Sequence, residues 1–481
     1  MSKEKRKESK EGITTKKEED ISEWYTEVVQ KAELADYAPV KGFMIIRPNA
    51  YSIWEKIQEE FDKTIKSKGV RNSYFPMLIP ESFFKKEAEH AEGFSPELAY
   101  IENSDEDGSE KLALRPTSET IMYDSYSKWI RSWKDLPLKI NQWCNVIRWE
   151  VKQTKPFLRT REFLWQEGHC AFETEKEAEK DMNEMINEYK KMMESLLAVP
   201  AIVGKKSEKE KFAGAKTTMT IEALMPDGKA LQCGTSHNLG QNFSKSFDIK
   251  FKGKDEKDNY IWQTSWGFST RLIGAIIMVH GDNKGLVLPP KIAENQIVIV
   301  PILFDKTKEK TLRKSKEIQK SLKKYSPLLD DREDYSPGRK FNEHELKGIP
   351  LRLEIGPKDI EKKQVTLVRR DTGKKEMIKE KELKEKIPKV LDEIQSELFK
   401  KAKKFLESNI DEAKSLTELN QKIKQGKIVK AYFKDSGDTE DHIKEATNGA
   451  TTRIIEESKK EGTCIQTQEK TKTIGYFAKS Y

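Results

Sequence analysis

The residues from 139 to 170 constrain the fold of this chain more than any other stretch. Segments 139–149 and 157–170 follow the two-residue period of β-strands, and the polar loop K-Q-T-K lies between them. Arg148 and Glu150 alternate along the first segment, so we expect them to share one strand face. The pattern predicts a hairpin within a mainly antiparallel sheet that is covered by helices.

The returning strand carries a second row of chemically active side chains. Arg159, Phe163 and Glu167 recur at four-residue intervals and should therefore share a face. A guanidinium can clamp both a carboxylate and an α-phosphate, a Phe ring can stack on adenine, and Glu150 can accept hydrogen bonds from its amino edge. These side chains are chemically suited to a nucleotide, and a solvated charged hairpin is the alternative.

A helical pattern over 49–68 ends at Gly69, and S-Y-F-P-M-L-I-P (73–80) then reads as a strand. A second long helix is marked by Met182, Met185, Ile186, Tyr189, Met193 and Leu196. Further β-rich patterns occupy 217–224, 229–233 and 259–268.

The stretch W-G-F-S-T-R-L-I-G-A (266–275) places Arg271 at the start of an apolar helix. An unpaired arginine there would be costly, so a phosphate, an adenine ring or a buried carboxylate should accompany it. The chain contains no G-x-G and no G-x-x-x-x-G-K-[ST], which disfavours a Rossmann site and a P-loop.

Composition limits the class of protein. With 481 residues the chain is too long for one hydrophobic core, and 35% charged residues with a net charge of +8 permit a polyanionic partner without requiring one. The four cysteines show neither metal-ligand spacing nor a disulfide framework, which suggests reduced thiols in the cytoplasm. We expect no membrane span and no secretory signal, and residues 1–20 should form a flexible charged tail.

Three segments together resemble the motifs of class II aminoacyl-tRNA synthetases. Residues 69–80 resemble motif 1, with Pro76 at a dimer interface, while 146–169 resemble motif 2 and 266–275 resemble motif 3. A proline that closes an edge strand would look like motif 1 as well. The resemblance implies an α+β catalytic domain built on an antiparallel sheet flanked by helices, and a homodimer.

From about residue 21 onward the chain resembles prolyl-tRNA synthetases. The resemblance is carried by S-E-W-Y, A-D-Y-A-P-V-K-G, L-R-P-T-S-E-T, F-L-R-T-R-E-F-L-W-Q-E-G-H, K-F-A-G-A and G-T-S-H-N-L-G-Q-N-F. Arg271 follows Glu167 by 104 positions, which leaves no room for the large editing insertion of the common bacterial type. The chain is therefore similar to the archaeal/eukaryote-like type, and editing of alanine in cis is not expected.

The family resemblance implies a domain order and the substrates L-proline, ATP with Mg²⁺, and tRNA(Pro). The expected parts are a tail (1–20), a catalytic domain (21–288), an α/β anticodon-binding domain (289–400) and a small α+β C-terminal domain (401–481). The enzyme would form prolyl-adenylate, release pyrophosphate and pass proline to the 3′ end of the tRNA. The alternatives are a class IIa synthetase for threonine or glycine, and a synthetase-like RNA-binding protein without catalysis.

The resemblance also implies a role for each residue of the motifs. Arg148, Arg159 and Arg271 would stabilise charge during catalysis. Proline would be bound by Thr117, Glu119, Arg148, Trp165, Glu167 and His237. ATP would be bound by Arg148, Glu150, Arg159, Phe163, Gln232, Thr235, Ser269 and Arg271. Glu222 is a candidate Mg²⁺ ligand, with a surface glutamate as the alternative.

Two further expectations concern the second half of the chain. Glu345, Arg352 and Lys374 would read the two guanines of a proline anticodon, since arginine suits the O6/N7 edge of guanine. Many relatives hold zinc in the C-terminal domain with four cysteines. The matching positions here are Lys434, Thr439, Cys464 and Thr467, and one thiolate cannot form a tetrahedral structural site, so we expect no zinc.

Overall fold

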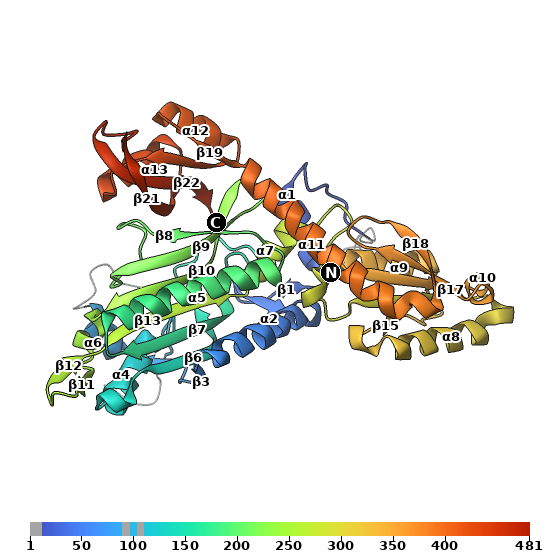
Figure 1. Ribbon diagram of the computed structural model, residues 1–481, viewed down its shortest axis with the longest axis horizontal. Helices are drawn as coiled ribbons and strands as arrows, with labels where there is room; N and C mark the ends of the chain where they lie inside the picture. The colour runs from blue at the N-terminus through green and yellow to red at the C-terminus, as the bar shows by residue number, and fades with distance from the viewer. Residues whose placement is uncertain (1–11, 89–96, 103–109) are drawn as a thin grey trace, which may run out of the picture.

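The computed structural model describes residues 12–88, 97–102 and 110–481 (Figure 1). A largely antiparallel sheet of eleven strands forms its centre. In sheet order its strands are β19 (Ile410–Glu412), β20 (Ile428–Tyr432), β22 (Lys470–Ser480), β21 (Thr451–Thr463), β8 (Ile202–Lys205), β9 (Thr217–Leu224), β10 (Lys229–Gly240), β13 (Trp262–Ser269), β7 (Glu162–Phe172), β6 (Leu138–Ile147) and β3 (Arg71–Asn72).

Helices cover one face of this sheet and leave the other face for the site. The covering helices are α1 (Ile21–Lys31), α2 (Pro48–Ser67), α5 (Glu175–Ser195) and α7 (Arg271–His280). Phe268 of β13 packs against Phe61 of α2 and Tyr189 of α5, with ring centroids 5.0 and 5.2 Å apart. Because side chains alternate along a strand, Gly267 and Ser269 face the opposite side of the sheet.

The predicted long helices are confirmed. Helix α2 begins with Pro48 at its first turn and ends before Gly69, whose φ of +80° suits glycine. Helix α5 begins with a capping box between Thr174 and Glu177. The strand predicted at 217–224 is β9.

The hairpin formed by β6 and β7 is present, but its strands are shorter than predicted. The prediction that Arg148 and Glu150 share a strand face is wrong, and Arg159 also lies outside the returning strand. Residues 148–161 instead form a broad loop, because Pro156 cannot donate to the strand ladder and the next residue takes a left-handed φ of +60°.

The prediction of one strand over 73–80 is also wrong. Only β4 (Leu78–Pro80) is paired there, with β5 (Leu112–Leu114), whereas Pro76 lies in the irregular segment before it. The remaining short elements of this part are β1 (Ala35–Tyr37), β2 (Met44–Ile46), α3 (Glu81–Ala88), α4 (Glu119–Trp129), α6 (Asn242–Ser246), β11 (Lys250–Lys252) and β12 (Asp258–Tyr260).

The predicted tail is only partly a tail. Residues 12–20 run along the catalytic part, where the Lys17 Nζ donates to the carbonyl oxygens of Met278 and Gly281 at 2.6 and 2.7 Å. For these residues the prediction of a flexible tail is wrong, and residues 1–11 lie outside the described part of the chain.

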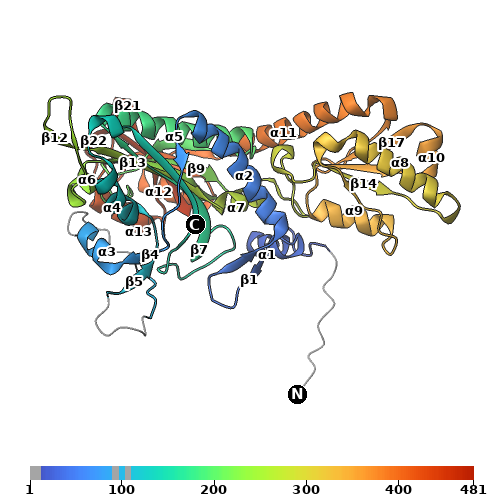
Figure 2. The same ribbon diagram turned by 90° about the horizontal axis from the view of Figure 1, so that it is seen from below.

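A second sheet builds the α/β part, at the opposite end of the molecule from the tips of α6 and β12 (Figure 2). Its strands, in sheet order, are β15 (Leu328–Leu329), β14 (Ile297–Pro301), β16 (Leu351–Ile355), β17 (Gln364–Arg369) and β18 (Lys375–Lys379). The helices of this part are α8 (Lys308–Ser321), α9 (Pro337–Leu346) and α10 (Pro357–Glu361).

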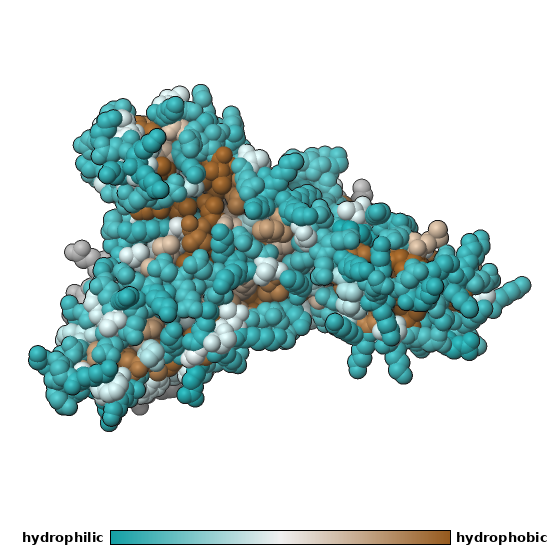
Figure 3. Space-filling view, viewed as in Figure 1, coloured by the Kyte–Doolittle hydropathy of each residue, from teal (hydrophilic) through white to brown (hydrophobic). Residues whose placement is uncertain are grey.

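Helix α11 (Leu383–Ser408) runs from the α/β part to the C-terminal part, which adds α12 (Leu416–Lys424) and α13 (Gly437–Ala446). The C-terminal strands extend the catalytic sheet, because β21 pairs with β8 and β22 pairs with β10. Hydrophobic side chains gather in the hollow between these two parts (Figure 3). Among the described residues, none of the helices is long and apolar enough to cross a membrane.

Candidate functional site

A cavity of about 490 Å³ opens on the face of the sheet that the helices leave free. It brings together thirteen of the residues predicted for the catalytic part. They are Thr117, Glu119, Arg148, Glu150, Arg159, Phe163, Trp165, Glu167, Gln232, Thr235, His237, Ser269 and Arg271.

The strand register explains how distant residues meet in this cavity. Glu167 of β7 lies opposite Gly267 of β13, which lies opposite Thr235 of β10, so the three form a row across the sheet. Gly267 places no side chain in the floor of the cavity, and the space there is narrow. A Cβ at this position would lie 2.8 Å from the backbone oxygen of Gln166 and 3.7 Å from the Trp165 ring.

The start of α4 forms the wall beside this row. Glu119 is the first residue of the helix, where the helix dipole favours an anion, and it is only 4% exposed. The Thr117 hydroxyl donates to the Glu119 carboxylate. The wall therefore presents a buried carboxylate whose orientation is held by its neighbour.

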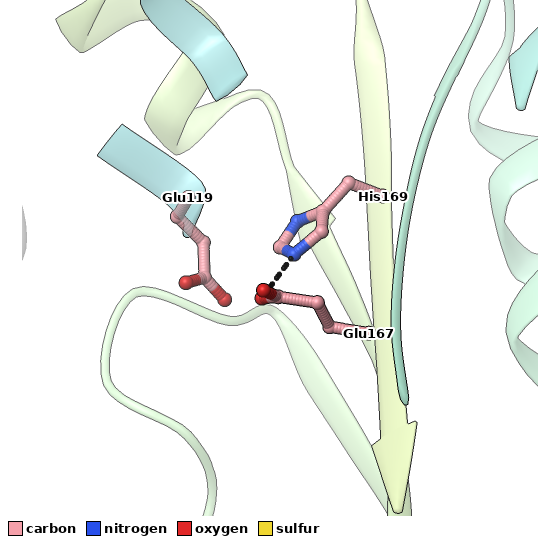
Figure 4. Close-up of side chains that lie close together, drawn as sticks. All are labelled: Glu119, Glu167 and His169. Atoms are coloured by element: carbon pink, nitrogen blue, oxygen red, sulfur yellow. Dashed lines mark hydrogen bonds and ion pairs between the residues drawn. The ribbon is translucent and has the colours of Figure 1, made fainter. Parts of the chain in front are cut away.

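Glu167 lies next to Glu119 and is hydrogen-bonded from several sides. Ser118 donates to it through its backbone N–H at 3.2 Å and its hydroxyl at 2.5 Å, and Gln142 donates through its amide at 3.0 Å. The His169 Nε2 lies 3.0 Å from its second oxygen (Figure 4). These contacts tie β6, β7 and the start of α4 into one network.

The network shifts the proton affinities of its members in opposite directions. Burial raises the pKa of the Glu167 carboxyl, but the hydrogen bond and charge of His169 outweigh it, so the pKa lies below its ordinary value. Burial lowers the pKa of His169, but Glu167 and Glu119 outweigh it and the pKa is raised. Burial lowers the pKa of His237 to about 3, so this second imidazole is neutral.

Two of the arginines reach the cavity by different routes. The Arg148 guanidinium lies over the Trp165 ring at 5.8 Å, and its buried Nε has no hydrogen-bond partner among the described residues. Arg271, the first residue of α7 as predicted, donates to the backbone oxygens of Leu158 and Gln232 at 3.0 and 3.1 Å. Burial lowers the pKa of Arg271, so an anion in the cavity would find a poorly solvated cation there.

Glu222 does not line the cavity, and the alternative of a surface glutamate is wrong because the residue is fully buried. The Lys206 Nζ and the Thr220 hydroxyl donate to one carboxylate oxygen at 3.0 and 2.9 Å, and Arg453 donates to the other at 2.9 Å. Each oxygen is thus already bound by a cation, which fits a structural carboxylate better than a Mg²⁺ ligand.

Among the cavity residues that were not predicted from the sequence, His169, Lys206 and Tyr481 carry titratable groups. His169 lies two residues after Glu167, and the strand period alone could have placed it on the same face. Lys206 and Tyr481 also line the cavity, and the Tyr481 hydroxyl donates to Asp227 at 2.7 Å. No local pattern in the sequence marks either of them.

Comparison with known proteins identifies the family. A family model described as the tRNA synthetase class II core domain (G, H, P, S and T) matches residues 100–280, an anticodon binding domain matches 296–390, and a prolyl-tRNA synthetase C-terminal domain matches 416–481. The proline–tRNA ligase of Natranaerobius thermophilus is 54% identical over 94% of both chains, and that of Alkaliphilus oremlandii is 51% identical over 97% of this chain and 98% of its own. The chain belongs to the prolyl-tRNA synthetase family.

The synthetase carries its predicted anticodon residues on the α/β part. Arg352 of β16 is 7% exposed, and its guanidinium lies 3.3 Å from Glu345 and 2.9 Å from Glu354. The same group lies 4.1 Å above the Phe341 ring. Lys374 is exposed in the turn between β17 and β18.

The C-terminal part of the synthetase has donor groups unsuited to zinc. Cys464 is buried, and its sulfur accepts the backbone N–H groups of Lys434 and Thr467 at 3.3 and 3.4 Å. The remaining matching position is Thr439, whose backbone N–H donates to the Ser436 hydroxyl instead. A single thiol among lysine and threonine side chains does not provide the four nitrogen or sulfur ligands that a structural zinc needs.

Proposed function

We propose that this synthetase activates L-proline with ATP and transfers it to tRNA(Pro). The observation that carries the proposal is the shared cavity, in which the Glu119 carboxylate and the Arg148 guanidinium lie on the same surface as Gln232, Thr235 and Arg271. A carboxylate suits the ammonium of an amino acid, and a guanidinium suits its carboxylate. The Trp165 ring supplies an apolar wall for a small ring.

The chemistry requires no side-chain nucleophile. One carboxylate oxygen of proline attacks the α-phosphorus of ATP, a new O–P bond forms, and pyrophosphate leaves with the electrons of the broken bond. The terminal hydroxyl of the tRNA then attacks the carbonyl carbon, and AMP leaves. Arg148, Arg159 and Arg271 would stabilise the charge that develops on the phosphate oxygens.

Mg²⁺, when it is bound with ATP, would supply positive charge that polarises the phosphates. Glu222 was predicted as a candidate Mg²⁺ ligand, but its two carboxylate oxygens are paired with Lys206 and Arg453. We therefore do not propose it as a ligand.

The direct test is ATP–pyrophosphate exchange with each of the twenty amino acids. Exchange should depend on proline, and Arg148→Ala should abolish it, because the Arg148 guanidinium lines the cavity and its buried Nε has no hydrogen-bond partner among the described residues, which leaves it available to a substrate oxygen. Exchange that depends on threonine or glycine would overturn the proposed substrate. A folded Arg148→Ala variant with near-normal exchange would remove this residue from the mechanism.

We infer that the α/β part reads the anticodon. Glu345 and Arg352 lie next to each other, and a carboxylate and a guanidinium suit the donor and acceptor edges of guanine. Arg352 would have to exchange part of its pairing with Glu354 for the base. Lys374 would contribute from the neighbouring turn.

We also propose a homodimer formed around the motif 1 segment. Tyr74, Met77 and Leu78 are 69, 37 and 37% exposed, and Trp129, whose ring lies 5.9 Å from that of Phe75, is 49% exposed. Such a gathering of large exposed apolar side chains suits burial against a second copy. Light scattering should find a dimer at micromolar concentration. A cytoplasmic location follows from the proposed role in protein synthesis.

Finally, we propose that the enzyme belongs to the archaeal/eukaryote-like type without an editing insertion. Between β7 and α7 the chain forms α5, the sheet strands β8, β9, β10 and β13, the short helix α6 and the small hairpin of β11 and β12. These elements account for the whole segment and leave no separate domain. Alanine charged to the tRNA should therefore persist when the enzyme acts alone.

A further inference from the structure

The wall of the cavity holds two buried carboxylates beside one imidazole. One carboxylate oxygen of Glu119, one of Glu167 and one ring nitrogen of His169 all lie within 4.8 Å of one another. None of the three residues is more than 4% exposed. Two buried anions this close would repel each other strongly unless a cation were paired with one of them. Figure 4 shows the His169 ring turned toward Glu167 rather than Glu119.

The two carboxylates have different hydrogen-bond and ion-pair partners. Glu167 is bound by His169, Gln142 and both donors of Ser118, the residue between Thr117 and Glu119. In the described part of the chain, no lysine, arginine or histidine nitrogen lies within ion-pair distance of Glu119. Glu167 thus serves as an anchor for the loop, while the Glu119 carboxylate faces the cavity without an ion-pair partner among the described residues.

We infer that His169 is a positioning residue for the amino acid: as an imidazolium it neutralises Glu167, which anchors the Thr117–Glu119 loop, and it thereby leaves Glu119 as the carboxylate that receives the substrate's ammonium. This inference rests on the proposed activation of proline. It assigns the cavity wall one net negative charge, which matches one secondary ammonium. With a neutral imidazole, the wall would carry either two negative charges or a proton on a carboxylate.

Both ring nitrogens of an imidazolium find suitable partners here. Nε2–H would donate to Glu167 at 3.0 Å, and Nδ1–H would donate to the Tyr123 hydroxyl at 3.2 Å. The titratable groups that face this imidazole or its partner are Glu167 on β7, Glu119, Tyr123 and Tyr126 on α4, Cys144 on β6 and His237 on β10. Burial keeps His237 neutral, so it adds no competing positive charge.

The inference predicts a defined pH dependence. The ion pair exists between the lowered pKa of Glu167 and the raised pKa of His169, and it is lost above the latter or below the former. Burial raises the pKa of Glu167, and His169 is the residue that lowers it most. In His169→Asn this lowering is lost, so the pKa of Glu167 should rise. Glu167 would then take up a proton at a higher pH than it does in the wild type, where the pair with His169 favours the ionised carboxylate.

The test is the KM for proline in pyrophosphate exchange, measured as a function of pH for the wild type and for His169→Asn. In His169→Asn, KM should rise about tenfold toward low pH, because a protonated Glu167 loses the charge that receives the hydrogen bonds of Ser118 and so anchors the Thr117–Glu119 loop less firmly. The kcat should change little. In the wild type the same rise should begin only at a lower pH, because His169 holds the pKa of Glu167 down. His344→Asn is the matched control, because it removes another buried histidine–carboxylate pair, with Asp330 at 2.8 Å, in the α/β part that exchange does not use.

The outcomes separate this inference from the proposed function. If the wild type shows no exchange with proline, the proposed function fails; if it does but His169→Asn raises KM equally at every pH, the inference fails alone. Should His169→Asn not fold, NMR titration of the imidazole in the wild type decides the question. His169 should remain protonated above its ordinary pKa of about 6.5, and deprotonation below that value would overturn the inference.

Discussion

Replacement of Arg453 by methionine should loosen the C-terminal part from the catalytic sheet. Arg453 is 6% exposed and donates to Glu222 through Nε and Nη2 at 3.2 and 2.9 Å, from a position 231 residues further along the chain. Methionine keeps much of the side-chain volume and removes the charge. Glu222 would then remain buried with Lys206 as its one cationic partner.

The cost can be worked from these contacts. Removal of one partner from a buried ion pair costs about 3–5 kcal/mol, and the remaining Lys206 places this case near the lower end. About 3 kcal/mol corresponds to roughly a hundredfold increase in the population of locally opened molecules. The effect should concentrate where β21 pairs with β8, at Ile455 opposite Lys205.

Amide hydrogen exchange measures this local opening directly. Peptides from β21 and β8 should lose about a hundredfold in protection, whereas peptides from β14 and β16 should not change. Lys434→Met is the matched control in the same part of the chain, because its pair with Glu469 is more than half exposed on both sides and should contribute little. If Arg453→Met keeps protection within twofold of the wild type, the ion pair does not hold the two parts together.

Three further outcomes follow from the structure. Arg352→Lys should leave pyrophosphate exchange intact. It should reduce the preference for tRNA(Pro) over a tRNA with one altered anticodon guanine by about tenfold to a hundredfold. An equal loss of activity on both tRNAs would make Arg352 a contact to the tRNA backbone or a structural residue. Gly168→Ala should lower thermal stability, by about 1–3 kcal/mol, because its Cβ would lie 2.3 Å from the buried Trp266 ring; an unchanged melting temperature would contradict this. Elemental analysis of protein purified without chelator should find no stoichiometric zinc. One zinc per chain would refute our interpretation that the positions around Cys464 cannot hold the metal.

The sequence predicted the long helices and the catalytic strands because their signals are local. The apolar spacing of α2 is complete within its own segment, and β9 lies where its alternation indicated. The loop at 148–161 was mispredicted because two features overrode the alternation: Pro156 has no N–H group, and Phe157 adopts a left-handed φ. Alternation of charged residues continues into a loop without any change of pattern, so it cannot mark the end of a strand by itself.

The candidate site was predictable where the motif residues lie together in sequence, and not where the chain returns from far away. The side chains of Arg148 and Glu167 reach one cavity even though the former lies outside the strand, because the loop folds back over the same sheet face. The partners of Glu222 are different: Arg453 comes from the C-terminal part, and nothing around either residue signals the other.

This pairing changes how the C-terminal part should be understood. A separate appendage would have its own sheet, but here β22 and β21 continue the catalytic sheet, and Arg453 meets a carboxylate that lies opposite Gln232 in the β9–β10 register. Gln232 in turn accepts a hydrogen bond from Arg271 through its backbone oxygen. A contact at the far end of the chain is thus connected, through two neighbouring strands, to an arginine of the cavity. We therefore expect the C-terminal part to help hold in place the surface on which ATP is proposed to bind.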